Sequence, residues 1–80
     1  RRAMDKPIVN VIVDLERGLD PARLHEIRST LADLAGVVHA QPSERLERMM
    51  LVGYDPRVIS AQAILESVRR RGLGAHLVGM

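Results

Sequence analysis

Hydrophobic side chains alternate with polar ones near the start of the chain and recur every three or four residues soon after it. Between Ile8 and Leu15, β-branched residues predominate and every second side chain falls on one face, which is typical of a half-buried strand. The side chains expected to face inward are those of Val9, Val11, Val13 and Leu15. The side chains of the alternating residues, Ile8, Asn10, Ile12 and Asp14, are expected to face away from the core.

A helix is expected after this strand. Asp20 can cap its first turn, and Pro21 suits the first helical position because proline lacks an N–H that would be left unpaired there. Apolar residues then follow at helical spacing, namely Leu24, Ile27, Leu31 and Leu34. Gly36 is expected to cap the C-terminus of this helix.

Two further strands are expected next, separated by a polar turn over residues 43–48. The first runs from Val37 to about Gln41. Pro42 follows it and cannot donate to a β-ladder, which places this strand at an edge of the sheet. The second covers residues 49–54, with alternate side chains directed inward.

The last third of the chain predicts a second helix and a short final strand. Ser60 is the expected N-cap of the helix, and Gly72 is expected to end it. Three arginines at positions 69–71 lie where positive charge complements the helix C-terminus, so they are interpreted as a solvated helix end rather than a site for an anionic partner. A strand over residues 75–78 completes the chain.

The order β-α-β-β-α-β predicts an α+β fold, a ferredoxin-like sandwich. We expect a four-stranded antiparallel sheet in the order 4-1-3-2, with two helices on one face. Eighty residues are enough for one domain, here residues 1–80, with residues 1–6 as a flexible N-terminal segment.

Several short motifs in this order resemble the heavy-metal-associated (HMA) family, which includes copper chaperones. The sequence Leu-Ala-Asp-Leu-Ala-Gly-Val at 31–37 resembles the family's helix exit, and Val-Gly-Tyr-Asp-Pro at 52–56 its third-strand ending. Gly-Leu-Gly-Ala at 72–75 resembles its last turn. The resemblance covers about residues 8–78, and it implies the ferredoxin-like fold and a Met-x-Cys-x-x-Cys metal loop before the first helix.

The chain departs from the family at that metal loop. Gly18 stands where the resemblance would place the methionine, and Asp20 and Arg23 stand where it would place the two cysteines. A substituted metal site is one interpretation of Asp20, but a single carboxylate beside a guanidinium is a poor cation site. The interpretation we favour is an N-cap, with Arg23 pairing locally.

Composition excludes several classes of function. The chain has no cysteine, so it has no disulfide and no thiolate metal site, which suits a reducing cytoplasm. Arg1 and Arg2 account for its net charge of +2, and Tyr54 is its only aromatic residue for stacking on bases, so nucleic-acid binding is not expected. No apolar run approaches the roughly 20 residues of a membrane span. No catalytic residues are expected, because a sandwich of this size has no deep cleft.

Histidine and methionine are the remaining candidate metal ligands. His25, His39 and His76 belong to different parts of the predicted fold and are not expected to converge. A weak pair of His76 with Asp20 is the strongest candidate, because the turn before His76 approaches the metal loop in the HMA family. Met49 and Met50 point to opposite faces of a strand, so they cannot share a Cu(I) ion. No metal and no cofactor are therefore expected.

The outer face of the sheet is the predicted working surface. The first and third strands are central neighbours in the expected order, and their outward-facing apolar residues are Ile12, Met49 and Leu51. Such a patch is typical of a protein contact. The alternative is a strand register shifted by one residue, which would exchange the two faces.

These observations predict a non-enzymatic, cytoplasmic accessory module in a metal-handling setting. It would act through a protein partner or a homodimer, without nucleic acid and without membrane insertion. Two alternatives stay open. One is a genuine metal-ion carrier that uses His and Asp ligands, and the other is a ligand-sensing regulatory domain.

Overall fold

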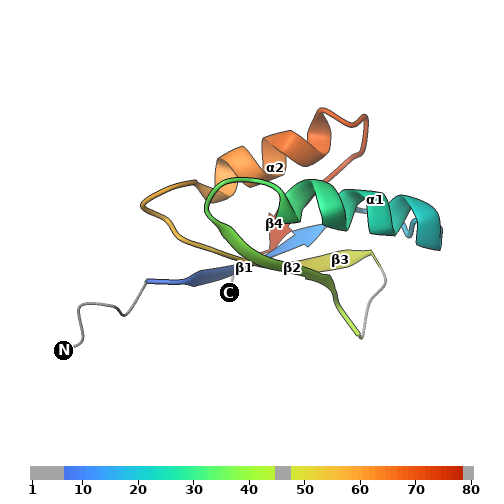
Figure 1. Ribbon diagram of the computed structural model, residues 1–80. Helices are drawn as coiled ribbons and strands as arrows, with labels where there is room; N and C mark the ends of the chain where they lie inside the picture. The colour runs from blue at the N-terminus through green and yellow to red at the C-terminus, as the bar shows by residue number, and fades with distance from the viewer. Residues whose placement is uncertain (1–6, 45–47, 79–80) are drawn as a thin grey trace.

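The computed structural model describes residues 7–44 and 48–78, and the expected N-terminal segment 1–6 lies outside them (Figure 1). The elements follow the predicted order. They are β1 (Val9–Asp14), α1 (Pro21–Ala32), β2 (Val37–Pro42), β3 (Met49–Tyr54), α2 (Ala61–Arg69) and β4 (His76–Val78).

The four strands form one antiparallel sheet in the order β2-β3-β1-β4, which is the predicted order 4-1-3-2 counted from the other edge. Both helices lie on the same face of the sheet, as the ferredoxin-like fold requires (Figure 1). β2 is an edge strand, as Pro42 predicts, and its pairing with β3 is irregular between Val37 and His39. The predicted fold class is confirmed.

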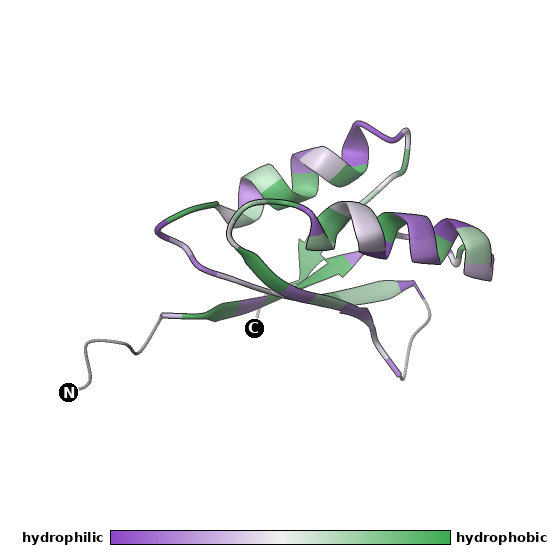
Figure 2. Cartoon of the chain, viewed as in Figure 1, coloured by the Kyte–Doolittle hydropathy of each residue, from purple (hydrophilic) through white to green (hydrophobic). Residues whose placement is uncertain are grey.

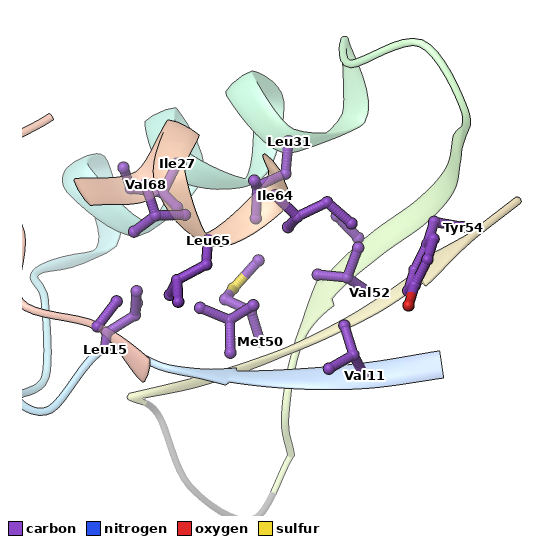
Figure 3. Packing of buried hydrophobic residues seen from close by; sticks show 13 residues of the cluster. Val11, Leu15, Ile27, Leu31, Met50, Val52, Tyr54, Ile64, Leu65 and Val68 are labelled. Atoms are coloured by element: carbon purple, nitrogen blue, oxygen red, sulfur yellow. The ribbon is translucent and has the colours of Figure 1, made fainter. Parts of the chain in front are cut away.

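The core lies between the sheet and the helices (Figure 3). Figure 2 shows apolar and polar residues alternating along both helices, and the buried ones are Ile27 and Leu31 of α1 and Ile64, Leu65 and Val68 of α2. The strand residues that reach this core include Val11, Val13, Met50, Val52 and Tyr54. The predicted strand register is therefore confirmed, and a shift by one residue is excluded.

Val9 is the most exposed of the residues predicted to face inward, with 40% of its surface accessible. Val9 is the first residue of β1 and pairs with Tyr54. The start of β1 extends beyond the two helices (Figure 1). Val9 therefore lies on the predicted face of β1 but stays partly exposed, because alternation selects a face without determining what packs against it.

Both predicted N-caps are confirmed. The carboxylate Oδ1 of Asp20 accepts a hydrogen bond from the Arg23 backbone N–H at 2.8 Å, and Ser60 Oγ accepts one from the Ala63 N–H at 3.1 Å. The prediction that Gly72 ends α2 is wrong, because the helix ends at Arg69 with Arg70 as its C-cap, and Gly72, with φ of +82°, belongs to the turn that follows. Each helix therefore begins with a side-chain acceptor for a backbone N–H that has no partner within the helix.

The predicted C-cap of α1 is wrong. The helix ends at Ala32 with Asp33 as its cap, and Gly36 serves the turn into β2 instead. Gly36 has φ of +96°, and a Cβ there would lie 2.8 Å from side-chain atoms of both Val58 and Ile59. Glycine is required at this position because the β3–α2 loop packs directly on its backbone.

Asp55 organises that β3–α2 loop. Its buried carboxylate accepts hydrogen bonds from the Arg57 backbone N–H at 2.9 Å and from the Arg57 guanidinium at 3.0 and 3.1 Å. The hydrogen bond to Asp55, and then the attraction of its charge, raise the pKa of Arg57 above the usual value. The ion pair of Asp55 with the exposed Arg57 side chain therefore stabilises the conformation of the β3–α2 loop.

Candidate functional site

The loop between β1 and α1 is the segment that the HMA resemblance would assign to metal binding. Asp20 uses one carboxylate oxygen to cap α1, and the Arg23 side chain points to Glu26, with 3.7 Å between Nε and Oε1. Gly18 is exposed, and a Cβ added to it would meet nothing within 4 Å. These three positions therefore serve the start of the helix or lie in open space.

A cluster of charged side chains lies beside this loop, where β1 and β4 pair. His76 Nδ1 is 2.9 Å from Glu16 Oε2, and His76 Nε2 is 3.5 Å from Asp14 Oδ2. Arg48 closes the other side of Asp14, with its Nε 3.2 Å from Oδ1. The Asp14 side chain is only 6% exposed, so its charge is compensated by Arg48 and by hydrogen bonds rather than by water.

Glu16 joins the loop to this cluster. Its backbone N–H donates to Asp14 Oδ1 at 2.8 Å, and its φ of +69° is in the left-handed region that non-glycine residues seldom adopt. Its carboxylate passes over Gly74, where an added Cβ would lie 2.6 Å from Oε1. The left-handed backbone of Glu16 and the missing side chain of Gly74 thus allow the Glu16 carboxylate to lie against His76.

The side chains of the cluster are arranged to pair with one another rather than to bind a metal ion. The two ring nitrogens of His76 face different carboxylates, so the donors do not converge on one point. Within residues 7–44 and 48–78, no group of three or more His, Cys, Asp or Glu side chains is arranged to hold a metal ion. A tight tetrahedral site needs three or four such donors.

The structure does not bring the candidate pair of His76 and Asp20 together as ligands. His76 lies against Asp14 and Glu16, which the sequence analysis did not single out, while Asp20 caps α1. The signal that could have found Asp14 is its register, because Asp14 pairs directly with His76 across β1 and β4. Glu16 gave no such signal, because its position depends on a left-handed turn.

The other two histidines lie near the opposite edge of the sheet. His25 is exposed on α1, as predicted, and His39 lies across Gly53 of β3, where an added Cβ would be within 3 Å of its ring. His25 and His39 border one shallow depression together with Arg28. The histidines of the two edges remain apart, because β2 and β4 are separated by two strands.

The outer face of the sheet carries the residues predicted to form a contact. Ile12 of β1 pairs with Leu51 of β3, and Met49 pairs with Asp14, so Ile12, Met49 and Leu51 share the face opposite the helices. All three are half-buried rather than fully exposed. The large apolar residues with more exposure lie elsewhere, and they are Ile8, Val9, Val38 and Val58.

A groove of about 570 Å³ opens on this face. Ile12 and Leu51 line it together with Gln41, Pro42 and Ser43, and one residue of each charge borders it, Arg28 and Glu44. Apolar side chains from two central strands thus line this groove together with one positive and one negative side chain. That arrangement suits contact with another macromolecule better than chemistry on a small substrate.

No helix in the described part of the chain is long and apolar enough to cross a membrane.

Comparisons with known proteins agree with the fold. No protein-family model matches the chain, and no curated protein matches its sequence. Among solved structures, the chain is similar to oxidized MerP from Ralstonia metallidurans CH34, with a TM-score of 0.79. The match covers 90% of this chain and 99% of that MerP chain at 14% sequence identity, so the likeness shows the fold alone.

Proposed function

We propose that this protein is a non-enzymatic binding module that works by protein contact through the outer face of its sheet. The observation that carries the proposal is the Ile12–Leu51 pair, two apolar side chains on central strands that lie opposite the helices and open into a groove. The HMA-like fold supports a metal-handling setting, and the absence of cysteine supports the cytoplasm.

The internal contacts of the β1–α1 loop support this assignment. Asp20 is engaged by the helix N-terminus, and Glu16 and Asp14 are engaged by His76 and Arg48. Binding a metal there would require breaking contacts that hold the loop to the sheet. The outer face needs no such rearrangement, because its apolar residues already border an open groove.

Site-specific photo-crosslinking tests the proposal. A p-benzoylphenylalanine at Leu51 should give adducts in cells with a small set of proteins identified by mass spectrometry, a second copy of the chain included. The matched control carries the same probe at Gln62, which is exposed on α2. Equal adducts from the two positions, or none from position 51, would overturn the proposal.

A metal carrier is the second candidate, favoured by one distance. Asp14 Oδ2 and His76 Nε2 are 3.5 Å apart, close to the separation of about 3.3 Å expected for two ligands about 2 Å from one zinc ion. Competition of the purified protein with a chromophoric chelator for Zn(II) and Cu(I) separates the two functions. The binding module should not compete, whereas stoichiometric submicromolar binding that His76→Ala abolishes would favour the carrier.

A further inference from the structure

We infer that the occupant of the outer groove is a second copy of this chain, related by a two-fold axis, with Arg28 of each copy facing Glu44 of the other. The inference rests on the proposed function, because it takes the outer sheet face as the contact surface. It adds the identity of the partner and the charges that orient it.

Among the residues that the structure describes, neither of the two charges that border the groove, Arg28 and Glu44, has an ionic partner. Arg28 Nε donates to the Ala40 carbonyl at 3.3 Å, which uses one of the five N–H groups of the guanidinium. Within residues 7–44 and 48–78, no ion pair involves Arg28 or Glu44. Each charge is therefore available to a group from outside the chain.

Because Arg28 and Glu44 carry opposite charges beside the apolar residues Ile12 and Leu51, the groove of one copy is complementary to the groove of a second copy. In a two-fold interface, residue i of one copy contacts residue j of the other, and j contacts i in return. Placing Ile12 and Leu51 against the same residues of a second copy buries these apolar side chains twice. The same rotation pairs Arg28 of each copy with Glu44 of the other, whereas a partner of uniform charge would match only one of them.

Pairing through the edge of the sheet is disfavoured on the β2 side. Arg28 occupies the Ala40 carbonyl of this edge strand, and Pro42 has no N–H to offer a further strand. Association through this part of the molecule is thereby directed to the face of the sheet. Arg28 serves both effects, because it blocks the edge with one nitrogen and borders the groove.

Charge exchange tests the inference by sedimentation velocity at low ionic strength. We expect R28E and E44R each to weaken self-association about tenfold, because each single change sets like charges against each other across the interface. The double variant R28E/E44R should restore the wild-type affinity. Net charge cannot explain this pattern, because the two single changes shift it in opposite directions.

Two controls complete the series. R70E alters by the same charge the exposed arginine that follows α2 as its C-cap, and it should leave association unchanged. Circular dichroism melts check that each variant is folded, and where a reversed charge unfolds the protein, R28Q and E44Q replace the reversals and should each weaken association less strongly.

The possible failures are distinguishable. A wild type that stays monomeric up to about 1 mM overturns the inference, since weaker contacts carry little binding free energy, while adducts of Leu51 with other proteins would leave the proposed function standing. A dimer that Leu51→Glu dissociates but the charge variants do not would retain the sheet face and overturn the Arg28–Glu44 pairing. A dimer that neither Leu51→Glu nor the charge variants affect would overturn both the sheet-face contact of the dimer and the Arg28–Glu44 pairing.

Discussion

Ile12 of β1 pairs with Leu51 of β3 in the sheet register, so the two residues share the face of the sheet opposite the core. The next residue on β3 toward the hairpin, Met50, points the other way and is completely buried. Leu51 and Met50 are therefore neighbours in sequence, but one faces the open side of the sheet and the other the core. Substitutions at these two positions can test the two faces of the sheet separately.

Leu51→Glu should leave the domain folded, with a free energy of unfolding within about 1 kcal/mol of the wild type, because the residue is half-buried on an open face. Self-association or partner capture should be lost. Met50→Ala is the matched control and should cost about 2–5 kcal/mol through a core cavity. Denaturant melts and sedimentation of both variants measure the two effects, and an unfolded Leu51→Glu protein would show that Leu51 belongs to the core.

Asp20→Ala should cost about 0.5–2 kcal/mol of stability, because the Arg23 N–H at the start of α1 loses its acceptor. Asp20→Ser and Asp20→Asn should cost much less, since both side chains can cap a helix. Ser60→Ala at the start of α2 should behave like Asp20→Ala. Urea denaturation of the four variants provides the comparison, and a fully stable Asp20→Ala protein would contradict the capping role.

Glycine-to-alanine substitutions should differ in a fixed order. Gly36→Ala should cost most, because it combines a φ of +96° with a clash against Val58 and Ile59. Gly72→Ala should cost about 1–2 kcal/mol, because its φ of +82° is unfavourable for alanine although the space around it is open. Gly18→Ala, with neither constraint, should be nearly neutral. Thermal melts rank the three, and an equal cost at positions 18 and 36 would contradict the packing of the β3–α2 loop.

Glu16→Gly should be more stable than Glu16→Ala by about 1 kcal/mol, because glycine adopts the φ of +69° without a Cβ penalty. Both variants lose the contact with His76 Nδ1, so the comparison isolates the backbone. NMR shifts of the His76 ring should change equally in both. Equal stability of the two variants would show that the left-handed turn carries no strain.

The amino-acid sequence by itself determined the order of the elements and the inward face of each strand. These features depend on local information: alternation at Val11, Val13 and Met50 selects a face, and Asp20 and Ser60 are acceptors that act within one helical turn. Such interactions span a few residues and can be read along the chain.

Only the tertiary structure decided how those elements meet. Asp14 and His76 are far apart in sequence, and their pairing follows from the register of β1 with β4, while the turn at Glu16 brings a second carboxylate to the same imidazole. Gly36 is needed by a loop some twenty residues later, and Val9 stays exposed because no helix extends over the start of β1. Contacts of this kind depend on which surfaces the fold brings together, and no local pattern encodes that.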